Sequence, residues 1–336
     1  MRRDRKERNK MKLCIDKNAI LRLEPTEAPQ PTDTEVTLRV KACGICGSDI
    51  PRVFMNKSYF YPIVLGHEFA GVVENSKKPE LIGKRACVFP ILPCGKCEFC
   101  AREQWANCVQ YDYYGSRRDG GMQDHLLVKE ENLIFLPDSV SDAAGSMIEP
   151  AAVCLHAVKK LHITSETVVT VYGAGTIGLL SAMWARAFGA KKVYVSDVDA
   201  ARLDFARTLG FEASGEETPD AVIEASGAPA ALNAALERIR AFGELVLVGN
   251  AERDVTLGQA NYSKLLRKQL TVCGSWNADR ASHADDWKDS IAAIAEGKID
   301  PEQLITHRFP LSEATKAFEL IGERKTFYNK ITLVTE

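Results

Sequence analysis

The sequence predicts an α/β protein in which a β-rich domain is followed by a domain built on a doubly wound parallel sheet. Its length of 336 residues is typical of about two domains. Short alternating or apolar runs, separated by Gly and Pro, fill the first 150 residues. After residue 152 strand-like and helix-like segments alternate, which favours parallel strands joined by crossover helices.

The first half contains mainly strand-like segments. Apolar and β-branched residues alternate within each segment, and turn-forming residues separate the segments. The expected strands cover residues 35–40, 69–73, 85–89 and 122–128. We expect this β-rich domain to span residues 11–151, with a loop-like lobe at about 90–110.

The second half repeats a strand followed by a helix. Strands are expected at 168–172, 192–196, 221–225 and 244–248, and helices at 176–188, 200–209 and 230–239. Near the C-terminus, a short helical run precedes a strand-like segment at 330–334. We expect the parallel-sheet domain to span 152–295, and residues 296–336 to return to the first domain.

Composition argues against several classes of partner. The net charge is −2, so the chain has no global attraction to nucleic acid or to an anionic membrane surface. No apolar run approaches the roughly 18 residues that a membrane-spanning helix needs. Ten cysteines without a secretory segment indicate a cytoplasmic protein. The charged residues 1–10 are expected to stay solvated, and we assign them no function.

Four cysteines with the spacing C-x2-C-x2-C-x7-C predict a structural zinc site. They are Cys94, Cys97, Cys100 and Cys108. Thiolates three residues apart in a tight turn can converge on one ion at about 2.3 Å, and the fourth thiolate closes the tetrahedron. The alternative is a pair of disulfides, which a reducing compartment disfavours.

A G-x-G-x-x-G motif follows the expected strand at 168–172 and opens the next helix. Its candidate cofactor-binding residues are Gly173, Gly175, Thr176, Ile177 and Gly178. Glycines in this position permit a tight turn and let the backbone approach a pyrophosphate held at the helix N-terminus. The motif therefore predicts a dinucleotide site, with a plain strand-to-helix turn as the alternative.

An acidic residue after the next strand indicates NAD rather than NADP. Asp197 follows the expected strand at 192–196. A carboxylate there can accept hydrogen bonds from the ribose hydroxyls, and it repels a 2′-phosphate. Asp199 lies past the strand and is expected to cap the following helix. Arg202 either reaches the adenosine side of the cofactor or belongs to a solvated helix face.

Three further segments resemble a known enzyme family. They are Gly44-Ile45-Cys46-Gly47-Ser48-Asp49, Gly66-His67-Glu68-Phe69-Ala70-Gly71 and Glu149-Pro150. With the cysteine lobe and the Gly173 motif, they make the chain similar to zinc-containing medium-chain dehydrogenases, in particular the polyol-dehydrogenase branch. The resemblance covers essentially everything after Met11. It implies a GroES-like catalytic domain, an inserted Rossmann domain and a catalytic zinc in the cleft between them.

The resemblance also implies roles for individual residues. Cys46, His67 and Glu149 correspond to ligands of the catalytic zinc, and Glu68 can enter or leave the coordination shell. A carboxylate at 149 departs from the better-known alcohol dehydrogenases and suits a polyol that chelates through two hydroxyls. Ser48 corresponds to the hydroxyl that accepts the substrate proton, with a local turn hydrogen bond as its alternative role.

Other segments extend the resemblance to branch members that act on polyol phosphates. They are 48–54, 61–62, 115–121, 264–268 and 274–276. The implied reaction is the reversible, NAD-linked oxidation of a secondary hydroxyl, such as galactitol 1-phosphate to tagatose 6-phosphate. Zinc would act as the Lewis acid.

Several residues are candidates for contacting the substrate. Arg117 and Arg118 are adjacent on a loop, where two guanidinium groups can bind a phosphate through bidentate hydrogen bonds, unless the loop is a solvated turn. Tyr59 and Trp276 are aromatic candidates for the cleft wall, with ordinary packing as the alternative. Further cations that face either the phosphate or the solvent are Arg52, Lys264, Arg267 and Lys268.

Two other functions fit parts of the sequence. The nearer one is a dehydrogenase of an unphosphorylated polyol such as sorbitol, or of a pentitol phosphate. The farther one is a non-catalytic protein that binds zinc or NAD, which the intact set of Cys46, His67 and Glu149 disfavours. By family resemblance we expect a homodimer or homotetramer with a small-molecule substrate, and no nucleic-acid or membrane partner.

Overall fold

The structure is a computed structural model that describes residues 10–335, so most of the charged opening tract lies outside the described residues. Its contacts divide the chain into two units. Unit 1 runs up to Glu149 and resumes at Ile305, and unit 2 comprises Pro150–Leu304. None of the helices within residues 10–335 has the length and apolar character needed to cross a membrane.

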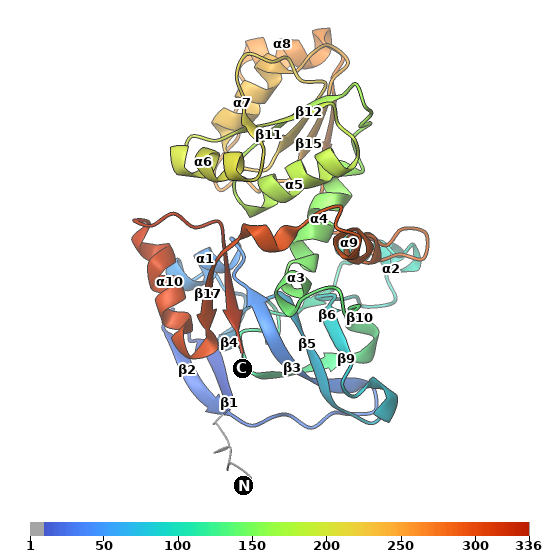
Figure 1. Cartoon of the computed structure of the whole chain (residues 1–336), viewed down its shortest axis with the longest axis vertical. Coiled ribbons are helices and arrows are strands. Elements are labelled where there is room, and N and C mark those ends of the chain that lie inside the picture. The colour runs from blue at the N-terminus through green and yellow to red at the C-terminus, as the bar shows by residue number, and fades with distance from the viewer. Residues whose placement is uncertain (1–9, 336) are drawn as a thin grey trace. The chain divides into compact units, whose positions relative to one another are not determined.

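Unit 1 is built mainly from antiparallel strands (Figure 1). Its largest sheet has the order β10-β6-β5-β3-β18-β17, and β9 also pairs with β3. These strands are β3 (Glu35–Gly44), β5 (Glu68–Ser76), β6 (Arg85–Val88), β9 (His125–Lys129), β10 (Leu133–Phe135), β17 (Ile305–Pro310) and β18 (Lys330–Val334). Because β18 pairs with β3, the end of the chain completes a sheet that begins near its start.

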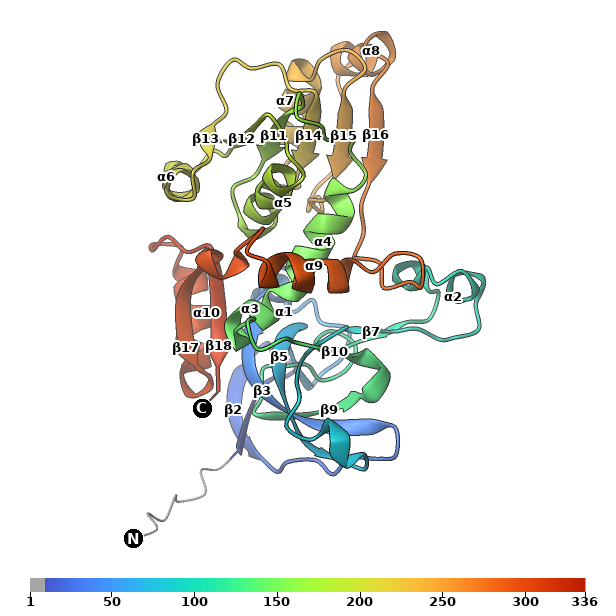
Figure 2. The ribbon, with the colours of Figure 1, turned by 45° about the vertical axis from the view of Figure 1, so that its right-hand side comes forward.

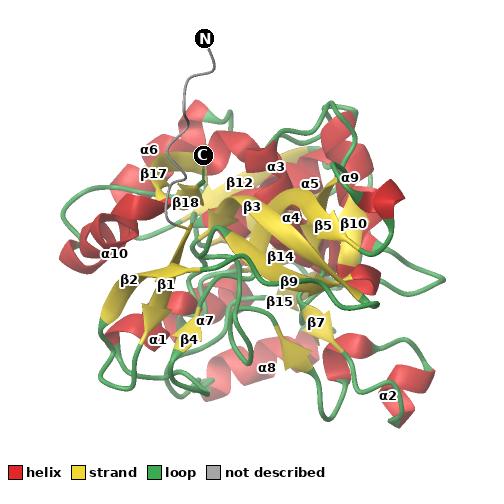
Figure 3. Cartoon of the chain, turned by 90° about the horizontal axis from the view of Figure 1, so that it is seen from below, coloured by secondary structure: helices red, strands yellow, loops and turns green. Residues whose placement is uncertain are grey.

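Two smaller sheets complete the β-structure of unit 1, and Figure 3 shows β1, β2 and β4 as a group of their own. This sheet joins β1 (Lys10–Ile15), β2 (Leu21–Thr26) and β4 (Ile63–Val64). The other joins β7 (Ile91–Leu92) to β8 (Asp112–Tyr113), on either side of the cysteine lobe. The helices are α1 (Asp49–Phe54), α2 (Glu98–Ala101), α3 (Asp142–Ser146) and α10 (Ala314–Glu323).

The core of unit 1 follows from the apolar pattern of its strands. Val36, Leu38 and Val40 of β3 are completely buried, as the two-residue period of a strand predicts. Phe318 and Ile321 of α10 belong to the same core cluster. Each such side chain contributes about 1.5–3 kcal/mol by leaving water. The sheet that carries the site residues is therefore held by a continuous apolar layer.

Unit 2 is a parallel sheet with the strand order β13-β12-β11-β14-β15-β16, visible in Figure 2. The strands are β11 (Val168–Tyr172), β12 (Lys192–Ser196), β13 (Glu212–Ala213), β14 (Ala221–Glu224), β15 (Glu244–Leu247) and β16 (Thr271–Gly274). The helices are α5 (Thr176–Ala187), α6 (Ala200–Thr208), α7 (Pro229–Arg238), α8 (Gln259–Arg267) and α9 (Asp286–Ala295). The chain adds strands first on one side of β11 and then on the other, which confirms the doubly wound fold.

The two junctions between the units lie close to the expected positions. The first falls inside α4 (Ile148–Val158), after Glu149. The second falls at Ile305 rather than at residue 296, because the chain after α9 still packs with unit 2. Pro301 and Leu304 are buried in this stretch. The return to unit 1 therefore begins only with β17.

Candidate metal and cofactor sites

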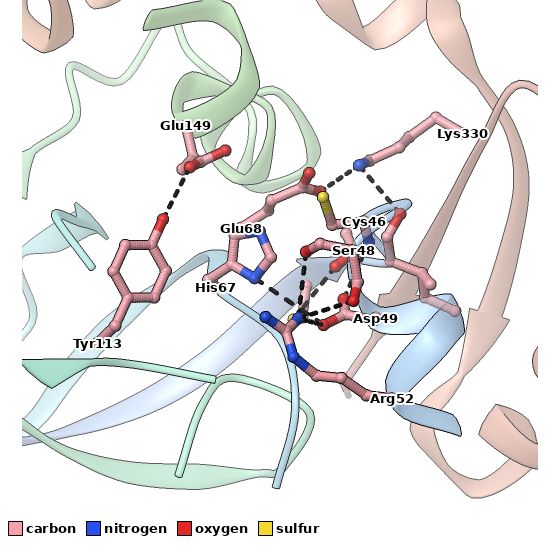
Figure 4. A network of polar contacts seen from close by, with 12 residues as sticks. Cys46, Ser48, Asp49, Arg52, His67, Glu68, Tyr113, Glu149 and Lys330 are labelled. Atoms are coloured by element: carbon pink, nitrogen blue, oxygen red, sulfur yellow. Dashed lines mark hydrogen bonds and ion pairs between the residues drawn. The ribbon is translucent and has the colours of Figure 1, made fainter. Parts of the chain in front are cut away.

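Three potential metal ligands come together in unit 1 (Figure 4). Cys46 lies in the turn between β3 and α1, His67 immediately precedes β5, and Glu68 begins it. One donor atom from each residue lies within 4.8 Å of the others. We name these three residues the donor group. A thiolate, an imidazole and a carboxylate at this separation form a set of ligands that suits zinc.

Backbone constraints explain how the donor group is assembled. Gly66 has a φ of +95°, and a Cβ on it would lie 2.5 Å from the Cys43 Sγ. Only glycine therefore permits the turn that leads into β5. Gly44 at the end of β3 pairs with Glu68. This register brings the turn that carries Cys46 next to the start of β5.

Asp49 orients two members of the donor group. Its buried carboxylate accepts hydrogen bonds from the Cys46 backbone N–H at 3.0 Å and from the Arg52 guanidinium at 3.1 Å. The same carboxylate lies 4.0 Å from Nδ1 of His67. Burial raises the pKa of Asp49, although His67 and Arg52 act in the opposite direction. A carboxylate behind a metal-binding imidazole fixes the orientation of the ring.

Negative groups surround the imidazole of His67. Burial lowers the pKa of His67, but Cys46, Asp49 and Glu149 outweigh burial and raise it to about 10. The surroundings therefore favour a positive charge at this point. A zinc ion supplies that charge when it replaces the proton, so the residues present fit a bound cation.

The two carboxylates at the site have different partners. Glu68 forms a buried ion pair with Lys330, which also donates to the Ile45 carbonyl at 3.1 Å. Glu149 accepts a hydrogen bond from the Tyr113 hydroxyl at 3.2 Å. Burial, together with Glu68, raises the pKa of Glu149 to about 7. Burial also raises the pKa of Tyr113 well above its ordinary value, so its hydroxyl keeps its proton.

The donor group differs from the expected ligand set in one carboxylate. The sequence pointed to Glu149 as the third ligand and to Glu68 as a residue that enters or leaves the shell. In the structure Glu68 lies with Cys46 and His67, whereas Glu149 lies outside their group. Glu149 lies in the first turn of α4, and its carboxylate accepts a hydrogen bond from the hydroxyl of Tyr113.

Ser48 lies at the N-terminus of α1 with its side chain exposed. Its hydroxyl oxygen accepts a hydrogen bond from Arg52 at 3.1 Å, and its carbonyl accepts another at 2.9 Å. One guanidinium nitrogen of Arg52, Nη1, thus donates to both Ser48 and Asp49. Its contact with the Ser48 hydroxyl makes that hydroxyl a better proton donor.

The four cysteines of the lobe converge as the sequence predicts. The sulfur atoms of Cys97 and Cys100 lie 3.5 Å apart, and those of Cys94 and Cys100 lie 3.9 Å apart. Cys108 completes the group. A tetrahedron with zinc–sulfur bonds of about 2.3 Å has sulfur–sulfur edges of about 3.8 Å, so the cluster fits one ion. None of the ten cysteines forms a disulfide, which contradicts the disulfide alternative.

The glycine motif forms the turn between β11 and α5. Gly173 has a φ of +100°, and a Cβ on Gly178 would lie 1.7 Å from the Gly173 carbonyl oxygen. Gly175 is the N-cap of α5, and Thr176 and Ile177 begin the helix. The N-terminal turn of a helix presents backbone N–H groups without intrahelical partners, which is a binding site for a pyrophosphate.

Asp197 lies directly beside this glycine turn. Its carboxylate accepts hydrogen bonds from the backbone N–H groups of Ala174 at 2.7 Å and of Asp199 at 2.9 Å. Asp199 caps α6 by accepting the N–H of Ala201 at 2.9 Å, as expected. Arg202 lies 3.7 Å from Asp197 and is partly exposed. The acid, the arginine and the glycine turn thus form one continuous surface in unit 2.

Arg117 lies between two aromatic rings. Its guanidinium carbon is 4.0 Å from the centroid of Tyr111 and 4.9 Å from that of Tyr59. Tyr111 contacts Tyr113 edge-on at 6.1 Å, and Tyr113 contacts His67 in the same way at 5.7 Å. No carboxylate within residues 10–335 forms an ion pair with Arg117. An arginine without a counter-ion is therefore joined to the donor group by aromatic contacts.

Arg118 has different surroundings. It forms an ion pair with Asp112 at 3.3 Å and lies over the Tyr114 ring at 5.2 Å. Its side chain lines a separate cavity with Lys12 and Glu35. The two adjacent arginines therefore do not form the joint phosphate clamp that their spacing suggests, because each one packs on different aromatic rings.

The other candidates for substrate contact lie on exposed or helical positions. Tyr59 is 63% exposed in unit 1, and Trp276 is 57% exposed after β16 in unit 2. Lys268 donates to a backbone carbonyl at the end of α7, and Lys264 donates to Asn261. These two lysines therefore serve the packing of α8.

Two residues of the site were missed in the sequence. Tyr113 lies in a two-residue strand after the cysteine lobe. The sequence showed only that an aromatic residue follows the lobe, which does not indicate a role at the site. Lys330 is the first residue of the expected strand at 330–334, and a lysine at a strand end is normally expected to be exposed. It is 3% exposed because Glu68 meets it inside the sheet.

Comparisons with known proteins match this geometry. A family model described as alcohol dehydrogenase GroES-like domain matches residues 32–138, and one described as zinc-binding dehydrogenase matches 176–296. Galactitol 1-phosphate 5-dehydrogenase of Escherichia coli K12 is 34% identical over 340 residues, covering 95% of this chain and 98% of the relative. D-arabitol-phosphate dehydrogenase of Enterococcus avium is 32% identical, and the match covers 88% of this chain and 89% of that protein.

A solved structure and a further relative in sequence give the same result. The crystal structure of galactitol-1-phosphate dehydrogenase from Escherichia coli superposes with a TM-score of 0.89 and 32% identity, covering 96% of this chain and 99% of that one. Sorbitol dehydrogenase of Bombyx mori is also 32% identical, over 89% of this chain and 92% of that protein. The chain is therefore an oxidoreductase that belongs to the zinc-binding alcohol dehydrogenase family, among its polyol dehydrogenases.

Proposed function

We propose that this protein is an NAD-dependent dehydrogenase of a polyol phosphate, with galactitol 1-phosphate as substrate and tagatose 6-phosphate as product. One observation carries the choice of a phosphorylated substrate. Arg117 has no carboxylate partner in the described chain, and the aromatic rings that hold it lead to His67. A guanidinium in this position can bind a phosphate through two parallel hydrogen bonds.

The residues of unit 1 divide the chemistry. Cys46, His67 and Glu68 would hold the zinc, which supplies a Lewis acid that lowers the pKa of the substrate hydroxyl. Ser48 accepts the proton of that hydroxyl and passes its own proton outward. Asp49 keeps the imidazole and the thiolate oriented. NAD, when bound, would accept the hydride that the alcohol carbon loses as it becomes a carbonyl carbon.

The residues of unit 2 bind the cofactor. The turn from Gly173 to Gly178, at the N-terminus of α5, would hold the pyrophosphate. Asp197 accepts the ribose hydroxyls, since a carboxylate retains lone pairs beyond the two backbone hydrogen bonds that it accepts in the structure. The same negative charge repels the additional phosphate of NADP. NAD is therefore the cofactor that we assign.

The test compares two adjacent arginines on several substrates. Steady-state NADH formation is measured for wild type, Arg117→Ala and Arg118→Ala, each with galactitol 1-phosphate, galactitol, sorbitol and arabitol phosphate. We expect wild type to prefer galactitol 1-phosphate. Arg117→Ala should lower kcat/KM for this substrate about 10- to 100-fold, the usual worth of a charge-assisted hydrogen bond, and leave turnover of galactitol unchanged.

Arg118→Ala is the matched control, because it removes the same charge from the next residue. We expect its kcat/KM to stay within about twofold of wild type. Turnover of unphosphorylated polyols alone would contradict the phosphate assignment and leave a general polyol dehydrogenase. A preference for arabitol phosphate would support Arg117 as the phosphate-binding residue but would change the assigned substrate. Equal losses of kcat/KM in both variants would support binding of the phosphate by both arginines.

A further inference from the structure

Tyr113 touches both the proposed phosphate anchor and the donor group. Its hydroxyl donates to Oε1 of Glu149 at 3.2 Å, a contact visible in Figure 4. Its ring meets the ring of His67 edge-on. Its backbone carbonyl accepts the N–H of Arg117 at 3.0 Å. We propose that Tyr113 is a positioning residue that holds Glu149 out of the donor group.

The need for such a residue follows from the number of available ligands. A catalytic zinc site keeps one of its four positions open for water or substrate. The donor group supplies three ligands, and Glu149 is held beside it by Tyr113, whose ring contacts the ring of His67. If Glu149 joined the other three, protein ligands would fill the tetrahedron and exclude the substrate. A partner that keeps Glu149 aside therefore preserves the open position.

The partner of Glu149 is weaker than the partner of the other carboxylate. Glu68 is bound to the ammonium of Lys330, whereas Glu149 is bound to a neutral hydroxyl. A buried carboxylate that loses its only strong donor must find another, because leaving it unsatisfied costs about 1–3 kcal/mol or more. A cation bound at the donor group would offer Glu149 such a replacement.

Tyr113 is well placed for this task. It belongs to β8, and β8 pairs with β7 across the base of the cysteine lobe, with Tyr113 opposite Ile91. The hydroxyl is therefore fixed by a strand pair rather than by a free loop. The same strand end carries the turn of Arg117. Removing the hydroxyl alone should release Glu149 without disturbing the phosphate anchor.

The experiment replaces Tyr113 by phenylalanine in cobalt-substituted full-length protein. The d–d absorption of Co²⁺ reports the coordination of the donor group without any substrate, and the four-thiolate lobe serves as an internal reference. We expect Tyr113→Phe to change the spectrum of the donor group and not that of the lobe. Transfer of zinc from the donor group to a chelator should slow about 10-fold, because Glu149 would add a fourth protein ligand.

Kinetics give a second readout. Glu149 would occupy the position of the substrate hydroxyl, so we expect kcat to fall about 10-fold. KM for the polyol phosphate should stay within about twofold, because the phosphate would still bind at Arg117. Arg117→Ala should do the opposite, raising KM and leaving the cobalt spectrum unchanged. A rise of KM in Tyr113→Phe with an unchanged cobalt spectrum would overturn the positioning role and make Tyr113 a substrate contact.

Two further variants make the inference specific to Glu149. Tyr114→Phe removes a neighbouring buried hydroxyl that accepts the Lys129 N–H, and it should leave spectrum and kcat as in wild type. The double variant Tyr113→Phe, Glu149→Gln should recover the wild-type cobalt spectrum, since an amide is a poor zinc ligand. A spectrum that stays altered in the double variant would refute the role of Glu149.

The inference rests on the proposed metal-binding role of the donor group. Its failure is distinguishable from failure of the substrate assignment, because the cobalt spectrum is recorded without substrate. If galactitol is preferred over its phosphate while Tyr113→Phe still changes the spectrum, only the substrate assignment fails. An unchanged spectrum and chelator rate in Tyr113→Phe would refute the positioning role alone.

Discussion

The cysteine lobe and the donor group are two metal-binding clusters in the same unit, and they are built in opposite ways. The four ligands of the lobe lie within one short loop, residues 94–108, and three of them are only partly buried. The donor group joins a turn after β3 to the start of β5, and two of its three members are buried. We therefore expect the lobe to need a metal ion in order to fold, and the donor group to need the fold in order to bind one.

The largest effect should come from the donor group. His67→Ala removes the imidazole, so we expect kcat to fall about 10³-fold, because a Lewis acid contributes several kcal/mol to the transition state. The lobe should keep its zinc, and the cooperative unfolding of the protein should remain. Turnover and zinc content per chain check this. Loss of both zinc ions, or of the folded state, would mean that the two clusters are not independent.

The lobe should respond in its stability rather than in its chemistry. Cys100→Ala leaves three thiolates, so we expect the loop at 93–111 to lose its zinc and to become sensitive to limited proteolysis. The midpoint of thermal unfolding should fall by several degrees, since about 1 kcal/mol corresponds to about 2–4 °C in a protein of this size. His67→Ala is the matched control, and it should leave cleavage of this loop unchanged.

The smallest effect is a pH dependence of the metal-free protein. The pKa of His67 is raised from 6.5 to about 10, so the folded state holds a proton that the unfolded state releases. The raised pKa of Glu149, from 4.5 to about 7, acts in the same direction at lower pH. The contribution of these two groups to stability should therefore be largest below about pH 4.5 and should fall as the pH rises toward 10.

Urea unfolding with and without zinc, at several values of pH between 6 and 9, measures this dependence. Zinc replaces the proton of His67, so we expect the zinc-loaded protein to show a flatter profile, and His67→Ala to flatten the metal-free profile. A metal-free protein that gains stability as the pH rises from 6 to 9 would contradict the charge balance of the donor group.

Arg117 and Arg118 are adjacent in the sequence but have different surroundings in the structure. Two adjacent arginines on a loop resemble a clamp, but consecutive side chains leave the backbone in different directions. Arg117 lies over the rings of Tyr111 and Tyr59, whereas Arg118 forms an ion pair with Asp112. Tertiary packing thus gives one arginine a counter-ion and leaves the other without one.

The sequence by itself determined the features that are local. The cysteine lobe and the glycine turn each lie within a short segment, so spacing alone indicates their geometry. The alternation of strands and helices likewise predicted the parallel sheet of unit 2, since each crossover is a local unit. The cap at Asp199 was predicted for the same reason.

Only the tertiary structure decided which carboxylate joins the donor group and which partners hold the two acids. Lys330 comes from the last strand and meets Glu68 because β18 pairs with β3. Tyr113 reaches Glu149 because β8 is held against β7. Such contacts depend on strand register between distant segments. A single sequence contains no spacing rule for them.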